Sequence, residues 1–433
     1  MKLDVYSNSI LIGALEQTDI TSFLFTYAPD ITDDQCVSLL MRPSVKRQWE
    51  HRFLHPVFQV SLPEGILRQV LTRTYAKQFK HFGDTELLAT IGGHLIGRNK
   101  MTPSGAPLAS EAPVKHLHDL LKETAEEMFE HYLHIHAKYS GVSGGFSKYL
   151  AKSPKAQENC TKSTLTFDHW IVKSNDDDHP DLVFNEYHSM RVAQLMGLRT
   201  PEFHTSPDFS RLAIKRFDFD EHGHSLGFED MCALNALNAD QKFSGSVERV
   251  IKSINAFCQP AQAKEAREQF FSQYLACMAL RNGDAHLKNF GLTYSTNLDA
   301  QMAPVYDMVT MSAYAPRQQG SNDALDEPAM NLNGVRRWPD EKAIVYLAAR
   351  CGVNMSKRAE AVQALSLAMA TVSEEIAHAA DSEELRPMAK RMLELWGHGL
   401  QIHDPQTARA IASLAAGIET DETTYQKRPR QRL

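Results

Sequence analysis

Alternating apolar and polar positions at the start of the chain predict short strands followed by helices. The alternation runs on both sides of a polar turn at residues 7–9, and a third apolar stretch ends at Pro29. Helical spacing follows in residues 61–75, with Pro63 in the predicted first turn. We therefore expect residues 1–105 to form a small N-terminal α/β subdomain.

Beyond this subdomain the pattern changes to a proline-containing segment and then to an amphipathic helix. Residues 101–114 are rich in Pro, Ser and Ala, which indicates a linker. The helix expected over residues 115–136 carries five histidines, but none of them stands in an H-E-x-x-H pattern. A solvated helix face explains them better than a metal site; they are His116, His118, His131, His134 and His136.

A strand-rich region precedes a helix-rich region in the rest of the chain. Residues 163–173 and 210–219 have the pattern of strands, and residues 179–198 between them that of a helix which Gly197 closes. Helical spacing then dominates, so the order predicts an α+β fold with two lobes. The expected units are a β-rich lobe at 106–225, a helical lobe at 226–415 and a disordered basic tail at 416–433.

Composition and charge limit the class of protein. A chain of 433 residues is too long for one small core. The net charge of −7 argues against a protein that coats nucleic acid by its bulk charge. The six cysteines are scattered without a C-x-x-C pair, which suits a reducing compartment. The polar N-terminus and the lack of an 18-residue apolar run predict neither a signal peptide nor a membrane span. We therefore expect a soluble, cytoplasmic protein.

A glycine-rich stretch at the start of the β-rich lobe is the first candidate for chemistry. Residues 139–150 read Y-S-G-V-S-G-G-F-S-K-Y-L, and glycine lets consecutive backbone N–H groups approach an anion. The spacing differs from a Walker A loop, so a flexible Gly/Ser turn is the alternative. The candidates for phosphate binding are Gly141, Val142, Ser143, Gly144, Gly145 and Lys148.

Lys173 closes the apolar strand W-I-V-K and is a candidate to contact nucleotide phosphates. Glu186, on the following helix, could orient it as a helix glutamate does in protein kinases. The alternative is a strand-end lysine that extends its charge to solvent. Further along, A-I-K-R-F-D reaches the junction of the lobes, where a kinase-like protein binds adenine through its backbone. The candidates for this hinge are Lys215, Arg216 and Phe217.

The stretch R-N-G-D-A-H-L-K-N-F-G has the most specific spacing. Asp284 and Asn289 are five positions apart, as in the catalytic loop H-R-D-L-x-x-x-N of protein kinases. Asp284 would act as the base, while Asn289 and Asp307, the latter in A-P-V-Y-D-M, would hold Mg²⁺. We expect His286 and Lys288 to shape the loop or to steady the transferred phosphate. A buried turn with a polar network is the alternative.

These motifs, in this order, resemble the HipA family of bacterial serine/threonine kinase toxins. S-G-V-S-G-G-F-S-K resembles its phosphate loop, although F-S-K stands where the family has Gln-x-Lys. R-N-G-D-A-H-L-K-N-F-G closely resembles its catalytic loop, and M-N-L-N-G-V-R-R-W-P is similar to another family segment. The resemblance extends over residues 1–400. It implies a two-lobed, protein-kinase-like (HipA-like) fold with a β-rich N-lobe and an all-helical C-lobe.

The resemblance also implies a function. ATP and Mg²⁺ would serve phosphorylation of a protein serine or threonine, and family members act on aminoacyl-tRNA synthetases to arrest growth. A HipB-like helix-turn-helix antitoxin would neutralise the toxin, and the two would bind operator DNA together. Family members autophosphorylate a serine near the phosphate loop, for which the candidates are Ser140, Ser143 and Ser147.

Three other functions stay open from the sequence. A small-molecule phosphotransferase, such as an aminoglycoside kinase, uses the same Asp–Asn spacing but has a histidine where Asn282 stands. A catalytically weak pseudokinase could act within a repressor complex. A metal-dependent enzyme that cleaves nucleic acid would use the same acidic residues, although the net charge of −7 disfavours it.

Overall fold

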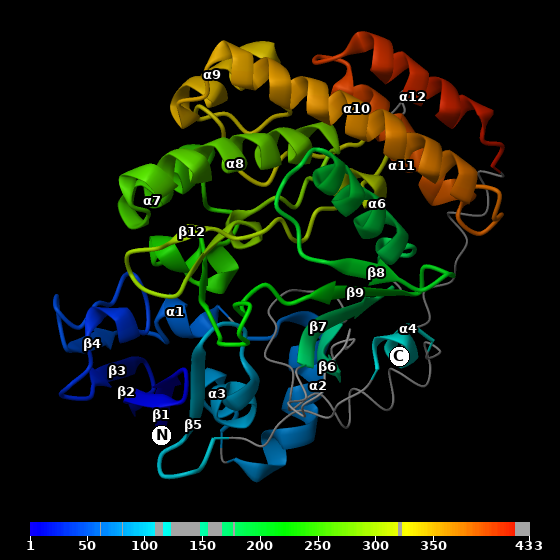
Figure 1. The fold of residues 1–433 in the computed structure, drawn as a ribbon. Helices are drawn as coiled ribbons and strands as arrows, with labels where there is room; N and C mark the ends of the chain where they lie inside the picture. Colours follow the sequence, from blue (N-terminus) through cyan, green and yellow to red (C-terminus); the bar gives the residue numbers. More distant parts are fainter. Residues whose placement is uncertain are drawn as a thin grey trace, which may run out of the picture.

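The chain folds into a small N-terminal subdomain, a strand-rich lobe and a lobe of long helices (Figure 1). The structure is a computed structural model that describes residues 1–60, 62–79, 81–108, 116–122, 148–154, 167–175, 178–318 and 323–420. Three separate sheets and many helices make up these residues. The α+β class and the two lobes expected from the sequence are therefore confirmed.

The N-terminal subdomain is built on one antiparallel sheet with strand order β4-β3-β2-β1-β5. Its strands are β1 (Lys2–Ser7), β2 (Ile10–Asp19), β3 (Ser22–Tyr27), β4 (Gln48–His51) and β5 (Asn99–Pro103). Its helices are α1 (Pro56–Gln59), α2 (Gly65–Tyr75) and α3 (Asp84–Ile91). Leu3 and Phe25 from the sheet pack with Phe58 and Leu88 from the helices, so the subdomain has its own apolar core.

Two expected boundaries in this subdomain are wrong. The first residues of the expected 101–114 linker belong to β5, which pairs with β1. Helix α2 begins at Gly65 with Glu64 as its N-cap, so Pro63 precedes the helix instead of lying in its first turn. The pairing of β5 with β1 joins segments far apart in the sequence, and local residue spacing does not encode such contacts.

The strand-rich lobe contains a four-stranded sheet of order β6-β7-β9-β8. Its strands are β6 (Lys148–Pro154), β7 (Phe167–Ser174), β8 (Phe203–Thr205) and β9 (Arg211–Lys215). Alternation along β9 places Ala213 against α4 (Leu117–Lys122), and Leu212 and Ile214 in the core shared with α6 (Leu182–Leu195). Helices therefore cover both faces of this sheet.

Two smaller expectations concern the same lobe. Gly197 follows α6 with a φ of +75°, and its N–H donates to the Gln194 carbonyl, so the helix ends where the sequence predicts. Of the five clustered histidines, His116 and His118 are exposed, and the other three lie outside the described residues.

Long helices form most of the second lobe. They are α7 (Val247–Phe257), α8 (Pro260–Ala279), α9 (Glu341–Cys351), α10 (Met355–Ala379), α11 (Arg386–Leu400) and α12 (Pro405–Gly417). Helices α8 and α11 approach each other very closely. A Cβ atom on Gly399 would lie 1.9 Å from the Ala279 carbonyl oxygen, so this contact requires glycine. The last helix extends two residues beyond the expected boundary at residue 415.

A small sheet corrects the expectation that the second lobe is all-helical. Its strands, in order, are β10 (Gly227–Asp230), β11 (Gly291–Tyr294) and β12 (Gln301–Met302). Strand β10 follows the hinge and β11 follows the catalytic loop, and Asp230 pairs with Gly291 across them. The sheet therefore anchors the catalytic loop to the start of the lobe. Strands of two to four residues are too short to show a periodic pattern in the sequence.

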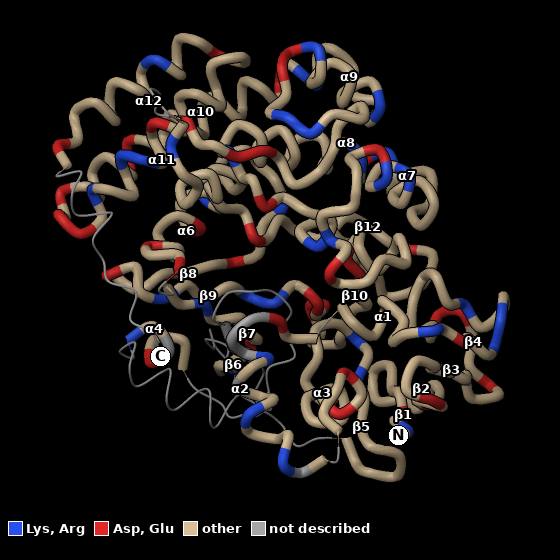
Figure 2. The backbone as a smooth tube through the Cα atoms, turned by 180° about the vertical axis from the view of Figure 1, so that it is seen from behind, with Lys and Arg blue, Asp and Glu red and all other residues tan. Residues whose placement is uncertain are grey.

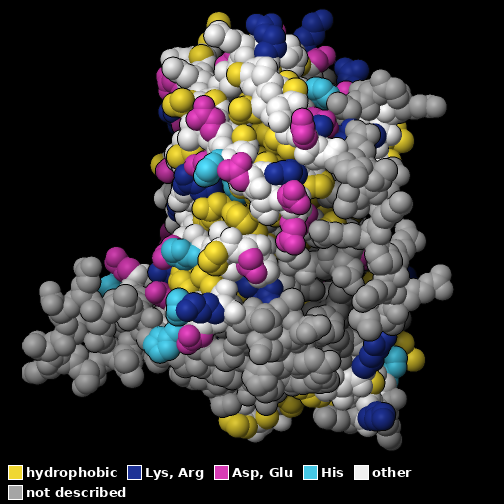
Figure 3. All heavy atoms as spheres, turned by 90° about the vertical axis from the view of Figure 1, so that its right-hand side faces the viewer, with side chains coloured by type: hydrophobic (Ala, Val, Ile, Leu, Met, Phe, Trp, Pro, Cys, Tyr) yellow, Lys and Arg dark blue, Asp and Glu magenta, His cyan; other side chains and the backbone are white. Residues whose placement is uncertain are grey.

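The charged residues are mixed rather than segregated. Figure 2 shows Lys and Arg interspersed with Asp and Glu along the backbone, and Figure 3 shows both signs among apolar side chains on one face. Within the described segments, no helix is both long enough and apolar enough to cross a membrane. The five cysteines in those segments are free and buried.

Candidate active site

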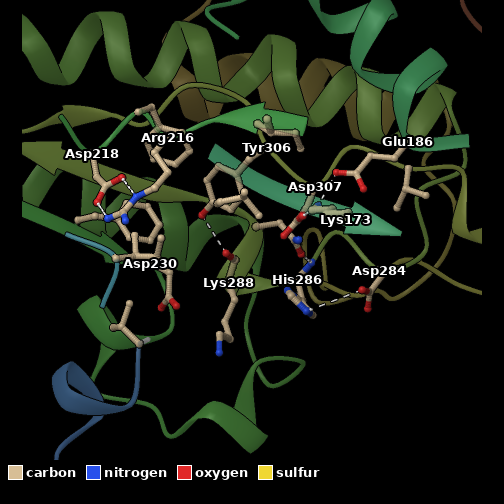
Figure 4. A pocket seen from close by; sticks show the side chains of 18 of the residues that line it. Lys173, Glu186, Arg216, Asp218, Asp230, Asp284, His286, Lys288, Tyr306 and Asp307 are labelled. Carbon is tan, nitrogen blue, oxygen red and sulfur yellow. Dashed lines mark hydrogen bonds and ion pairs between the residues drawn. The ribbon is translucent and has the colours of Figure 1, made fainter. Parts of the chain in front are cut away.

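A cavity between the lobes brings together most of the residues that the sequence marks for chemistry (Figure 4). Its walls come from β7, α6, the hinge, the catalytic loop, the segment after β12 and the N-terminal subdomain. The predicted site residues that line it are Lys173, Lys215, Arg216, Phe217, Asp284, His286, Lys288, Asn289 and Asp307. The fold therefore gathers these separate motifs around one space.

Lys173 is the centre of three charged residues, here called the Lys173 triad: Lys173, Glu186 and Asp307. Its ammonium donates to Glu186 Oε1 at 2.5 Å and also to Asp307 Oδ1. Burial by itself lowers the pKa of a lysine, but the two carboxylates outweigh it, so the pKa of Lys173 is raised. The pair with Glu186 is the one that the sequence predicts. The side chain is buried, so Lys173 is not a lysine that extends its charge to solvent.

Helix α6 also holds the backbone at Thr310, three residues after Asp307. The Asn185 amide oxygen accepts from the Thr310 N–H at 2.7 Å, and its nitrogen donates to the Thr310 carbonyl at 3.0 Å. Asp307 itself has a φ of +51°, in the left-handed region that non-glycine residues rarely adopt. Such a conformation persists where surrounding contacts enforce it, which is typical of functional sites.

Asn282 connects the catalytic loop to the Asp307 segment. Its side-chain oxygen accepts from the Asp284 N–H at 3.1 Å, and its nitrogen donates to the Asp307 carbonyl at 3.5 Å. The sequence marks Asn282 only as a departure from histidine-led loops. In the structure it is a positioning residue for the two aspartates.

The loop itself ends in a short 3₁₀-helix, η7 (Leu287–Asn289). The Asn289 side-chain oxygen accepts from the His286 N–H at 2.9 Å and so closes the turn. A carbonyl oxygen has two lone pairs, so this bond leaves Asn289 one for a metal ion. The Tyr306 hydroxyl donates to the Lys288 carbonyl at 2.8 Å and fixes the end of the loop.

Burial controls the protonation of the loop. It raises the pKa of Asp284 to about 6, with the charge of Lys242 acting against it and that of Asp307 in the same direction. A carboxylate with a pKa near neutrality is suited to act as a general base. Burial also lowers the pKa of His286 to about 3, so this imidazole is neutral. Its Nε2 lies 3.9 Å from Asp284 Oδ2.

The predicted hinge lines the other end of the cavity, where Figure 4 shows Arg216 beside Asp218. The Lys215 N–H donates to the Glu202 carbonyl and the Arg216 N–H to the His169 carbonyl. No group in the described part of the chain accepts from the Phe217 N–H. The Phe217 ring stacks on Tyr306 with centroids 5.5 Å apart, which gives this end an apolar wall.

The N-terminal subdomain contributes a carboxylate to the cavity, a feature that sequence reasoning missed. Glu64 Oε1 accepts from Lys288 at 2.6 Å, and Glu64 Oε2 lies 3.4 Å from the Lys242 ammonium. These three residues are called the Glu64 triad below. Burial alone raises the pKa of Glu64, but the two lysines outweigh it and the pKa is lowered. The three positions share no local motif, so only the folded chain reveals the group.

The remaining candidates concern the binding of phosphate and of a metal ion. The loop residues 141–145 and the serines at 140, 143 and 147 lie outside the described residues. Lys148 is the first residue of β6, and its backbone pairs with Lys173. Within the described segments, no three or more His, Cys, Asp or Glu residues could hold a metal by themselves. Asp307 and Asn289 could supply two oxygen ligands, which suits an Mg²⁺ ion that also binds nucleotide phosphates.

The fold and the cavity place the chain among two-lobed, kinase-like proteins. Family models for the HipA N-terminal domain and the HipA-like C-terminal domain match residues 3–101 and 140–382. The second match alone covers more than half of the 433 residues. The chain therefore belongs to the HipA family, as its motifs predict.

Two curated proteins that are named as kinases are similar to parts of this chain. A "Putative kinase" of Haemophilus influenzae is 28% identical over 34% of this chain and 46% of its own length. "Putative kinase Y4dM" of Sinorhizobium fredii is 25% identical over 68% of this chain and 70% of its own length. The chain thus spans less than half of the first relative.

A solved structure supports the fold over nearly the whole chain. It is a chain of the Shewanella oneidensis complex of the toxin–antitoxin proteins HipA and HipB with operator DNA. The TM-score is 0.57 and the identity 18%, and the match covers 96% of this chain and 95% of the other. At this identity the similarity shows a shared fold.

Proposed function

We propose that this protein is an ATP-dependent serine/threonine protein kinase and the toxin of a toxin–antitoxin pair. The observation that carries the proposal is the meeting of the Lys173 triad with Asp284 and Asn289 in one cavity. A lysine paired with a helix glutamate, a loop aspartate and a metal-binding aspartate are the parts that phosphoryl transfer from ATP requires.

In this proposal each residue has one task in the transfer. Asp284 accepts the proton of a serine or threonine hydroxyl, whose oxygen bonds to the γ-phosphorus. The bond from that phosphorus to the β,γ-bridging oxygen breaks, and ADP leaves with the electron pair. Asn289 and Asp307 would hold Mg²⁺, which neutralises phosphate charge. Lys173, oriented by its pair with Glu186, would contact the phosphates.

The nucleotide base would bind at the hinge. Lys215 and Arg216 use their N–H groups within the protein, so the Phe217 N–H is the backbone donor that we assign to adenine. The loop at 141–148 would cover the phosphates, as the family resemblance implies.

The partners follow from the family. We propose that a HipB-like helix-turn-helix antitoxin neutralises the protein and that the two bind operator DNA as a complex. The chain's structural relative was solved with HipB and operator DNA, which supports this assembly. The protein substrate would be cytoplasmic, and an aminoacyl-tRNA synthetase is the family-based candidate.

The proposal is tested with purified protein, γ-labelled ATP and Mg²⁺. Asp284→Asn should lower phosphate transfer about a thousandfold, because general base catalysis contributes on that order, while ATP still binds. Asp381→Asn, at an exposed position in the second lobe, should retain full activity. Phosphoserine or phosphothreonine in the product supports the proposal. Equal activity of Asp284→Asn and wild type would overturn the assignment of the base.

The effect of expression on bacterial growth distinguishes a toxin from an inactive family member. Expression of the wild type should arrest bacterial growth, and Asp284→Asn should relieve the arrest. An arrest that persists with Asp284→Asn would indicate a toxic activity independent of phosphate transfer.

A further inference from the structure

The cations that line the cavity differ in how firmly carboxylates hold them. Among the lysine and arginine residues in the described part of the lining, Lys242 has the longest distance to its nearest carboxylate. Lys173 bonds Glu186 at 2.5 Å and Asp307 more closely still. For the other cations the shortest nitrogen–oxygen distances are 2.5 Å for Arg216, 2.6 Å for Lys288, 3.0 Å for Lys215 and 3.4 Å for Lys242. Lys242 is therefore the cation whose contact with a carboxylate an incoming anion replaces most easily.

His286 and Lys288, which the sequence suggests as residues that steady the transferred phosphate, are less available to contact it. His286 is buried, with only 6% of the residue exposed. Lys288 is buried, with a side chain 7% exposed, and its ammonium bonds Glu64 at 2.6 Å. The side chain of Lys242 is 21% exposed within the same cavity. A cation for the phosphoryl group is thus available from another segment of the lobe.

The backbone of Lys242 is tied to the catalytic loop. The Leu287 N–H donates to the Lys242 carbonyl at 3.2 Å. The neighbouring Phe243 ring meets the His286 ring edge-on, with centroids 5.1 Å apart. A Cβ atom on Gly245 would lie 2.5 Å from Leu287 Cγ, so the turn packs closely against the loop. These contacts hold the Lys242 segment in a defined place beside Asp284, and the Lys242 charge is close enough to oppose the effect of burial on the pKa of Asp284.

We propose that Lys242 is a catalytic residue that contacts the phosphoryl group during its transfer. The proposal rests on the kinase function proposed above. A lysine ammonium donates charge-assisted hydrogen bonds to phosphoryl oxygens, and such bonds assist catalysis when the charge in the transition state meets a prepositioned donor. Glu64 holds Lys242 near this position without satisfying it fully, because the same carboxylate bonds Lys288 more closely.

Binding of two nucleotides distinguishes this role from a structural ion pair. ADP lacks the γ-phosphate, whereas a nonhydrolysable imido analogue of ATP carries it. Lys242→Met should bind ADP like the wild type but bind the analogue about tenfold more weakly, because one charge-assisted contact is lost. Its kcat should fall about a hundredfold, the loss typical for one donor to a developing charge. Lys242→Arg keeps the charge and should recover part of the analogue affinity and part of kcat.

Lys252→Met is the matched control, because Lys252 is an exposed lysine on α7 outside the cavity. It should match the wild type in all three measurements. Equal weakening of ADP and analogue binding by Lys242→Met would show a structural role and overturn the proposal, as would an unchanged kcat. If the wild type itself transfers no phosphate, the proposed function fails as well. If the wild type is active and only the Lys242 prediction fails, the kinase assignment stands.

Discussion

The two charged triads in the cavity have opposite composition. The Lys173 triad places one cation between two carboxylates, and the Glu64 triad places one carboxylate between two cations. With every group ionised, the first carries one net negative charge and the second one net positive charge. The first is therefore suited to a metal ion and the second to an anion. One cavity thus offers separate sites for the two charged parts of a metal–nucleotide complex.

The triads also differ in origin. Glu186 and Asp307 belong to the kinase-like body that contains Lys173. Glu64 belongs to the N-terminal subdomain and contacts lysines of the second lobe. The subdomain is therefore part of the cavity wall. A kinase-like body without the subdomain would lack the carboxylate that bonds Lys288.

The largest expected effect comes from the Lys173 triad. Asp307→Asn removes the carboxylate that we assign to Mg²⁺ and should lower phosphate transfer about a thousandfold or more, since metal ions supply several kcal/mol to such reactions. The assay is initial-rate transfer from labelled ATP. Asp381→Asn serves again as the exposed control. Activity of Asp307→Asn within tenfold of the wild type would refute the metal assignment.

Removal of the carboxylate from the Glu64 triad should mainly affect stability. Glu64→Gln should lower the free energy of unfolding by about 2 kcal/mol at neutral pH, because a charge-assisted bond to buried Lys288 is lost. Urea unfolding measures this difference. Glu50→Gln, on an exposed position of β4, should change the free energy little. No loss with Glu64→Gln would mean that Lys288 finds another partner.

The ion pair between Glu64 and Lys288 also predicts how the free energy of unfolding depends on pH. The pKa of Glu64 is lowered in the folded state, so its stabilisation is complete above the unfolded value near 4.5. It is lost as the pH falls through the folded value, and the difference between wild type and Glu64→Gln should shrink there. A difference that grows towards acid pH would contradict the assigned charges.

A smaller effect links the Glu64 triad to the base. The pKa of Asp284 is raised to about 6 by burial, so kcat/KM should fall as the pH drops through that value. The Lys242 charge opposes this shift, so Lys242→Met should move the acid limb of the profile upward. An acid limb that stays unchanged or moves downward would show that the Lys242 charge does not act on the base.

The contrast between the triads also shows what the sequence could predict. The Lys173–Glu186 pair and the Asp284–Asn289 spacing were predictable because family motifs encode them at fixed offsets. Glu64 could not be assigned, because its partners lie in another lobe and no periodicity links these positions. The three-stranded sheet was missed because its strands have at most four residues. Tertiary contacts, rather than local preference, determine the Glu64 triad and this small sheet.

The most direct test of the assignment of the metal to the Lys173 triad and the anion to the Glu64 triad is the effect of Mg²⁺ on nucleotide affinity. Calorimetry of the nonhydrolysable ATP analogue, with and without Mg²⁺, compares wild type, Asp307→Asn and Glu64→Gln. We expect Mg²⁺ to tighten binding about tenfold or more in wild type and in Glu64→Gln, and to have little effect in Asp307→Asn. A full Mg²⁺ response in Asp307→Asn, or its loss in Glu64→Gln, would contradict the assignment of metal to the Lys173 triad.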